Sequence, residues 1–289
     1  MKNKQLLLLL FSITLFLAIS FVSCQKYADG SNQAGKQNVA LYLNDDPSYN
    51  FTKVLVDIRF VEIKVDTGRH DAQHDDDDDD DDDDNHGYDE HGQWDTLQIT
   101  PGVYDLLRLR NGVDTLLANG FILNGRITKV RFTLGNNNSV YTDSVTSQPL
   151  SICDNKRYVY AKVKSDAIDV LPNGQISLHI DFNVTKSIKL RNGAYCLKGE
   201  LKAYSQNGCG KIEGKVFPRA ARPLIKVFNA TDTAYAIPFS EGEYKVTGLK
   251  AGTYTVYFDA TSPYIDTTIN NVIVTRGNET HLPNIVLHQ

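Results

Sequence analysis

The sequence predicts an all-β protein made of two antiparallel, sandwich-like domains that follow an export signal. Three observations carry this prediction. After residue 37, apolar and polar residues alternate with a period of two, which is typical of strands with one buried face. Clusters of Gly, Asn, Asp and Pro separate these segments, as turns between strands do. A chain of 289 residues is also longer than one small sandwich needs, so two domains are expected.

Residues 1–23 have the pattern of a secretory signal peptide. Two lysines precede an uncharged, Leu-rich run that ends at Val22. Ser23 and Cys24 follow, and this junction resembles the lipobox of bacterial lipoproteins, where the cysteine takes diacylglycerol and becomes the new N-terminus. The resemblance implies a membrane contact through a lipid anchor in the cell envelope, at the outer membrane, on its periplasmic or its outer side. An uncleaved signal anchor is the alternative.

Residues 24–37 are small and polar, so we expect a flexible tether, followed by a first domain over residues 38–209. The apolar face changes between Phe60 and Val61, which predicts a β-bulge there. Val103–Arg110 has the only helical pattern in this domain. Further strands are expected at Ile127–Leu134, Tyr158–Val163, Ile176–Phe182 and Tyr195–Tyr204.

A second domain is expected over residues 210–289. Strand patterns at 242–246 and 253–257 flank the turn sequence Gly248-Leu249-Lys250-Ala251-Gly252. About seven strands fit in this length, which suffices for a small sandwich, and Leu282–Leu287 is the expected last strand.

The first domain contains an acidic insert, residues 67–93, with ten consecutive aspartates at Asp75–Asp84. We expect a disordered loop, because like charges repel and almost no apolar surface is available to bury. The alternative is loose binding of divalent cations such as calcium, because imidazoles and carboxylates are concentrated there. The ligands would come from His70, His74, Asp75, Asp84, His86 and His91.

A repeated triplet, Asp followed by Ser or Thr and a third residue, resembles a bacterial O-glycosylation motif. An equally good explanation is that Asp starts turns and Thr starts strands. The acceptors that the resemblance implies are Thr96, Thr115, Ser144, Thr233 and Thr267.

Three cysteines besides Cys24 permit one disulfide in an oxidising envelope. Cys196 and Cys209 are close in sequence and are the first choice, while the other pairings and no bridge at all stay open. No Cys/His spacing indicates a zinc site. The formal net charge of −5 and the missing basic stripe argue against nucleic acid as a partner.

Motifs of enzymes are missing from the sequence. We find no GxSxG elbow, no HExxH, no phosphate-binding glycine loop and no dinucleotide fingerprint. His179 and Asp181 share one face of an expected strand, but no plausible nucleophile accompanies them. We therefore expect no catalytic residue, no cofactor and no enzymatic activity.

Several segments of the first domain resemble the bacterial lipoprotein family named domain of unknown function 4382. The matching segments are Leu41–Pro47, Trp94–Leu97, Tyr104–Leu109, Thr128–Leu134, Ile180–Phe182 and Ser187-Ile188. The resemblance implies an envelope setting and a β fold, without an activity.

The second domain resembles the carboxypeptidase-regulatory, transthyretin-like sandwiches, which are grouped under the carbohydrate-binding-like fold. This makes a sugar one ligand to consider, although sugar sites usually present exposed Trp or Tyr rings and the only tryptophan, Trp94, lies in the first domain. We therefore expect a non-catalytic binding or structural module of the cell envelope, with a glycan or a protein as ligand. The alternative is a divalent-cation-binding protein that acts through the acidic insert.

Overall fold

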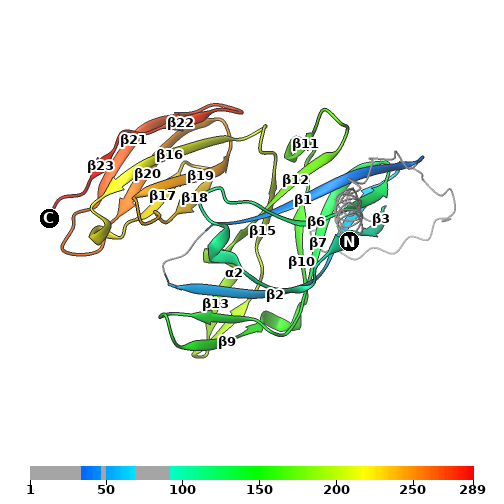
Figure 1. The fold of residues 1–289 in the computed structure, drawn as a ribbon, viewed down its shortest axis with the longest axis horizontal. Helices are drawn as coiled ribbons and strands as arrows, with labels where there is room; N and C mark the ends of the chain where they lie inside the picture. The colour runs from blue at the N-terminus through cyan, green and yellow to red at the C-terminus, as the bar shows by residue number, and fades with distance from the viewer. Residues whose placement is uncertain (1–33, 47–49, 69–91) are drawn as a thin grey trace, which may run out of the picture. The chain divides into compact units, whose positions relative to one another are not determined.

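The computed structural model describes residues 34–46, 50–68 and 92–289 (Figure 1). Strands dominate these residues, and α2 (Val184–Ser187) is their one α-helix. The predicted all-β class is confirmed. The signal peptide, Cys24 and the insert residues named above as cation ligands lie outside the described residues.

A six-stranded sheet has the order β11-β12-β1-β6-β4, with β15 also paired to β12. Within this sheet, β1 runs parallel to β12 and antiparallel to β6. The strands are β1 (Lys36–Asp46), β4 (Gln98–Ile99), β6 (Thr115–Leu123), β11 (Ile168–Val170), β12 (Ile176–Asn183) and β15 (Leu201–Tyr204).

A nine-stranded sheet has the order β10-β7-β2-β8-β9-β14-β13, and β3 and β5 pair with β2. The pairing of β2 with β7 shifts register between Ile58 and Phe60, so the predicted bulge is confirmed. The strands are β2 (Lys53–Asp66), β3 (Gln93–Thr96), β5 (Gly102–Asp105), β7 (Arg126–Leu134), β8 (Ser139–Tyr141), β9 (Ser147–Ile152), β10 (Tyr158–Lys162), β13 (Ile188–Arg191) and β14 (Ala194–Leu197).

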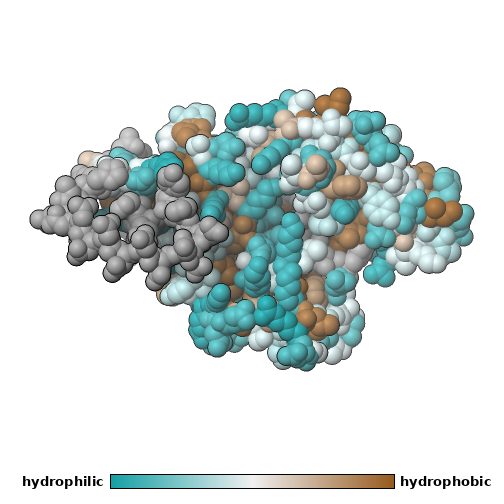
Figure 2. Space-filling view, turned by 180° about the vertical axis from the view of Figure 1, so that it is seen from behind, coloured by the Kyte–Doolittle hydropathy of each residue, from teal (hydrophilic) through white to brown (hydrophobic). Residues whose placement is uncertain are grey.

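Side chains from both of these sheets form one hydrophobic core. Leu41 and Phe182 contribute from the six-stranded sheet and Phe132 from the nine-stranded one, all fully buried. Alternation along β7 places its apolar residues on the inner face, whereas β12 is buried on both faces. On the surface that Figure 2 shows, hydrophobic residues form small patches separated by hydrophilic ones.

The strands from β16 onward, yellow to red in Figure 1, enclose a separate core around Tyr254, Val256 and Phe258. They form two four-stranded sheets: β19-β16-β22 with β23 paired to β16, and β18-β17-β20-β21. The strands are β16 (Gly210–Phe217), β17 (Leu224–Phe228), β18 (Thr233–Ala236), β19 (Glu243–Leu249), β20 (Gly252–Asp259), β21 (Thr267–Val274), β22 (Glu279–His281) and β23 (Ile285–Val286).

Two expected elements differ from the structure. Val103–Arg110 is not an α-helix: Val103 and Tyr104 pair with β2 as part of β5, and only Leu106–Leu109 forms a short 3-10 helix, η2. The expected strand Tyr195–Tyr204 is divided into β14 and β15. Gly199 lies between them with a φ of +74°, a left-handed conformation that turns the chain out of the strand.

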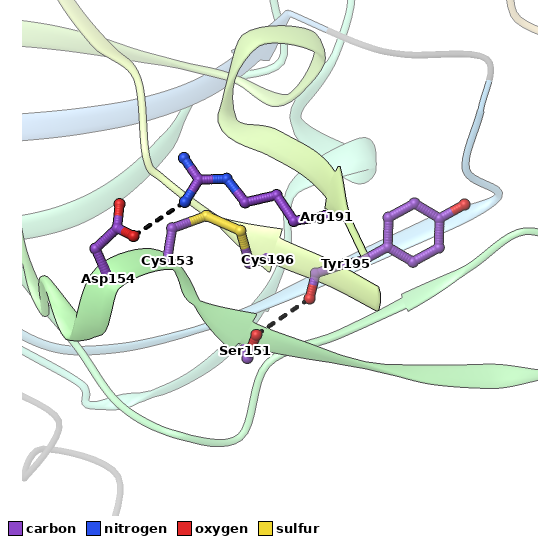
Figure 3. Close-up of a disulfide and its surroundings, with 6 residues drawn as sticks. All are labelled: Ser151, Cys153, Asp154, Arg191, Tyr195 and Cys196. Carbon is purple, nitrogen blue, oxygen red and sulfur yellow. Dashed lines mark hydrogen bonds and ion pairs between the residues drawn. A yellow bond between two sulfur atoms is a disulfide. The ribbon is translucent and has the colours of Figure 1, made fainter. Parts of the chain in front are cut away.

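The disulfide joins Cys153 to Cys196, so the first choice of Cys196 with Cys209 was wrong. β14 runs parallel to β9 with Cys196 opposite Ser151, which leaves Cys153 and Cys196 with a Cα–Cα distance of 5.1 Å. Figure 3 shows the Arg191–Asp154 ion pair beside this bond. Cys209 keeps a free thiol just before β16, and burial raises its pKa. The choice of cysteine partner is thus set by strand pairing, which brings distant residues together, and not by closeness in sequence.

Candidate functional site

The outer face of the sheet β18-β17-β20-β21 carries a hollow of about 510 Å³. Alternation along β17 and β20 buries Ile225, Val227 and Phe258 in the core, so the intervening side chains face outward. The hollow is lined by Leu224, Lys226, Phe228, Tyr235, Tyr257 and Asp259.

The two tyrosines of the hollow stand on either side of Lys226. In the strand register, Lys226 is opposite Tyr235 on β18 and opposite Tyr257 on β20. Because neighbouring strands are about 4.8 Å apart, the backbones that carry the tyrosines are about 10 Å apart. All three residues are half-buried. The strands therefore place the two tyrosines in one row across the sheet, with Lys226 on the strand between them.

Contacts with neighbouring side chains position Tyr257 and Lys226. The Tyr257 hydroxyl donates a hydrogen bond to Asp266, and this bond raises the pKa of Tyr257 to about 12. Asp266 itself accepts a hydrogen bond of 2.8 Å from the Ala260 backbone N–H. The Lys226 ammonium lies 4.7 Å from the centre of the Phe228 ring. Aromatic faces combined with a few fixed polar groups suit a ligand that has both apolar faces and hydroxyl groups.

A second polar region lies at the end of β1, where Asp45 is 5% exposed. Burial, and then the charge of Asp181, raise the pKa of the Asp45 carboxyl well above its ordinary value, although the Val184 backbone N–H and Arg110 oppose the shift. A cavity of about 180 Å³ is lined by Asp45, Asp181 and other oxygen-bearing side chains.

His179 belongs to a contact that sequence reasoning missed. Its Nε2 lies 3.2 Å from the Ser177 hydroxyl, and its Nδ1 lies 3.4 Å from Asp114, which precedes β6. A histidine between a serine hydroxyl and an aspartate is also the arrangement of a hydrolase triad. Ser177 is only 6% exposed, however, and His179 is 4% exposed and stacks on Tyr42. Because a substrate cannot reach this hydroxyl, we interpret the contact as structural.

Among the described residues, one group of three potential metal ligands comes together: Glu213, Glu279 and His281. The Lys245 ammonium already occupies this group, 2.9 Å from Glu213 and paired with Glu279. The hydrogen bond from Lys245 lowers the pKa of Glu213. A resident ammonium supplies the positive charge that a metal ion would bring, so this group is an ion-pair network between β16, β19 and β22.

The repeated Asp-Ser/Thr triplets are partly explained by the structure. Four of their aspartates accept hydrogen bonds from backbone N–H groups, and the fifth, Asp114, pairs with His179. The acceptor residues Thr96 and Ser144 are exposed, whereas Thr115, Thr233 and Thr267 are half-buried. Glycosylation stays a prediction, with Thr96 and Ser144 as the accessible positions.

Cys24 and the expected cation ligands His70, His74, Asp75, Asp84, His86 and His91 lie outside the described residues. In the described part of the chain, no helix is long and apolar enough to cross a membrane.

Comparison with known proteins gives a family match. The family model described as "Domain of unknown function (DUF4382)" matches residues 36–199. No curated protein sequence matches the chain significantly.

Several solved structures share weak similarity with the chain. A cohesin–X-dockerin complex (Coh3ScaB-XDoc_M2ScaA) from Acetivibrio cellulolyticus is 24% identical over 27% of this chain and 56% of that chain, with a TM-score of 0.23. The TIE protein of Bacillus anthracis is 11% identical over 82% of this chain and 35% of its own, with a TM-score of 0.24. The minor pilin GBS52 of Streptococcus agalactiae is 8% identical over 88% of this chain and 97% of its own, with a TM-score of 0.21. This chain thus spans little more than half of the first of these structures, and TM-scores of this size carry no conclusion about function.

Proposed function

The chain belongs to the DUF4382 family, and we propose that it is a non-catalytic binding module of the cell envelope whose ligand is a carbohydrate. The observation that carries the proposal is the row Tyr235–Lys226–Tyr257 in the hollow of the C-terminal sheet. Tyrosine supplies a flat apolar face with a polar edge, and such rings stack on the apolar faces of sugars. The predicted resemblance of residues 210–289 to the carbohydrate-binding-like fold supports the same ligand.

The envelope setting rests on two features of the chain. The lysines, the Leu-rich run and the Ser23-Cys24 junction have the pattern of a lipoprotein signal. The Cys153–Cys196 disulfide suits an exported protein, because oxidising compartments preserve disulfides and the cytosol does not. We propose that the lipid on Cys24 holds the protein at the outer membrane.

Titration calorimetry with soluble neutral polysaccharides tests the ligand. Replacing Tyr235 and Tyr257 by Ala should weaken binding about tenfold or more, because each change removes a stacking surface. Tyr257→Phe keeps the ring and loses only the hydrogen bond to Asp266, so it should bind nearly as well as the wild type.

The control uses two tyrosines of another sheet, which are more exposed than Tyr235 and Tyr257. Tyr158 and Tyr160 on β10 are 52% and 46% exposed, and replacing both by Ala should leave binding unchanged. Equal losses in both double variants, or none in the Tyr235/Tyr257 variant, would contradict the site.

Metabolic labelling with a fatty acid tests the anchor. The wild-type protein should take up the label, and Cys24→Ser should give an unlabelled, unprocessed and larger product. A wild-type protein that takes up no label excludes the lipid anchor.

A second candidate function, divalent-cation binding, is favoured by the composition of the acidic insert alone. Deleting residues 70–91 should abolish calcium or zinc uptake if the insert binds ions. Carbohydrate binding in the C-terminal hollow should survive that deletion, which separates the two functions.

A further inference from the structure

The polar cavity near the end of β1 borders the hollow of the C-terminal sheet at Tyr235. This tyrosine of β18 lines both the cavity and the hollow. The other walls of the cavity come from β1, β12, β15 and β19. Its volume is about 180 Å³, whereas roughly 10–15 Å³ is enough for one water molecule, so the cavity has room for part of a ligand. A ligand that lies against Tyr235 can therefore contact both places.

Two buried amide oxygens in the cavity wall lack a hydrogen-bond donor. Asn44 and Asn111 line the cavity and are 5% and 8% exposed. Asn44 Nδ2 donates a 2.7 Å hydrogen bond to the Tyr204 hydroxyl, and Asn111 Nδ2 donates one of 2.7 Å to the Ile237 carbonyl. Within the described part of the chain, the Oδ1 atom of each amide has no partner. Because a buried acceptor without a donor costs free energy, these oxygens indicate that an occupant of the cavity donates to them.

The charges around the cavity favour a neutral occupant. The Lys202 ammonium lies 3.0 Å from Asp232, and Arg110 and the Val184 backbone N–H both act on the Asp45 carboxyl. Neither sign dominates the lining, so it offers no strong attraction to a cation or to an anion. The charged side chains that line the cavity are Asp45, Asp181, Lys186, Glu200, Lys202, Asp232 and Lys245.

A sugar unit supplies the groups that this wall requires. Each of its hydroxyl groups can donate one hydrogen bond and accept two. The donors suit the Oδ1 atoms of Asn44 and Asn111. The exposed Lys186, which also lines the cavity, offers an ammonium group to the hydroxyl oxygens. Tyr235 adds an aromatic ring for the apolar face of the sugar.

We propose that the cavity binds one sugar unit of a neutral oligosaccharide whose other units lie in the hollow of the C-terminal sheet. The hydroxyl groups of this unit donate to the amide oxygens of Asn44 and Asn111 and accept from the Lys186 ammonium. The inference rests on the proposed carbohydrate function and deepens it. Because the cavity and the hollow share Tyr235, the ligand is a chain of sugars and not a single one.

Calorimetry with oligosaccharides of defined length tests this subsite. They are prepared by partial hydrolysis of a soluble neutral polysaccharide that the wild-type protein binds. Affinity should rise with length until both the cavity and the hollow are filled, and then stay constant. The monosaccharide should bind about tenfold more weakly or worse, because it can fill only one of the two places.

Three single changes in the cavity wall assign the contacts with the longest oligosaccharide. Lys186→Met removes an exposed ammonium, and Asn44→Leu replaces the amide by an apolar group of similar size. Asn111→Gly removes the amide and still accepts the left-handed φ of +58° at this position. Each change should weaken binding about three- to tenfold, the usual effect of one lost hydrogen bond. Thermal unfolding shows which variants are folded.

Lys189→Met is the matched control for Lys186→Met. Lys189 is also exposed and lies on β13, and it does not line the cavity. This variant loses the same charge and should bind as the wild type does. Equal losses in the two lysine variants would assign the effect to net charge and refute the subsite.

The remaining outcomes separate the subsite from the proposed function. The subsite is also refuted if Lys186→Met and every folded asparagine variant bind as the wild type does while the Tyr235/Tyr257 double variant does not. The cavity then holds water only, and the hollow remains the carbohydrate site. A wild-type protein that binds no soluble neutral polysaccharide overturns the proposed function, and this inference with it.

Discussion

At the residue scale, the disulfide connects segments that are far apart in the sequence. Cys153 and Cys196 are separated by 43 residues, and a cross-link over such a loop restricts the unfolded chain. Cys153→Ser should lower the free energy of unfolding by about 3–4 kcal/mol, measured by urea unfolding under oxidising conditions. Cys209→Ser is the control, since it removes a thiol outside the bridge and should cost less than about 0.5 kcal/mol. Similar losses in both variants would exclude the assigned pairing.

The Lys245 network should make stability depend on pH. Lys245 lowers the pKa of Glu213, so the ionised carboxylate stabilises the fold above its unfolded pKa, and this contribution is lost as the pH falls through the lowered folded pKa. Glu213→Gln should therefore cost up to about 1 kcal/mol at neutral pH and almost nothing near pH 3. Urea unfolding at both pH values measures the difference. An equal cost at the two values would mean that the charge contributes nothing.

At the scale of elements, Gly199 separates β14 from β15. Its φ is +74°, and an added Cβ would lie 2.4 Å from Val159 Cγ1. Gly193, in the turn between β13 and β14, has a similar φ of +78°, but no described atom lies within 4 Å of its Cβ position. Gly193→Ala should cost about 1 kcal/mol from backbone strain alone.

Gly199→Ala adds a steric clash to that strain and should cost about 2–4 kcal/mol. The difference between the two alanine variants, read from chemical unfolding curves, isolates the contact with Val159. Variants of equal stability would show that β10 moves away without cost.

Elements with a strong local signal were predictable from the sequence, and those set by distant pairing were not. The phase change at Phe60 and Val61 is local, and the bulge was found. The pattern at Val103–Arg110 also fits a helix, but pairing with β2 holds its first residues in a strand. The whole segment 195–204 alternates, and the conformation of Gly199 could not be read from that alternation.

The candidate sites also depend on strand pairing between distant residues, which the sequence does not show. Tyr235 and Tyr257 join one row only because both of their strands pair with β17. A sequence pattern cannot show that register. The search for an exposed Trp in the second domain therefore missed the two tyrosines. Asp114 likewise contacts His179 from a distant part of the sequence. Asp181 is only two residues from His179, and it was therefore the partner considered from the sequence.

At the scale of the whole molecule, the buried Ser177–His179–Asp114 contact bears on whether the protein is an enzyme. Because Ser177 is enclosed, we expect no turnover of a small activated ester such as p-nitrophenyl acetate by the wild type above the background rate. Ser177→Ala should give the same rate. Hydrolysis by the wild type that Ser177→Ala abolishes would assign a hydrolase activity and overturn the non-catalytic proposal.

The position of β1 in its sheet affects how the protein is made. β1 is the first described strand in the chain, yet it lies between β6 and β12, which come much later (Figure 1). Val39 pairs with Gly120 of β6 and with Ile176 of β12. Folding that depends on such distant pairing is slow, because the loop between the partners must close before either strand is stabilised. We therefore expect β1 to stay unpaired until β6 has been synthesised, and its sheet to close only after β12. If the proposed export signal acts, this late closure would leave the first domain unfolded while it crosses the membrane.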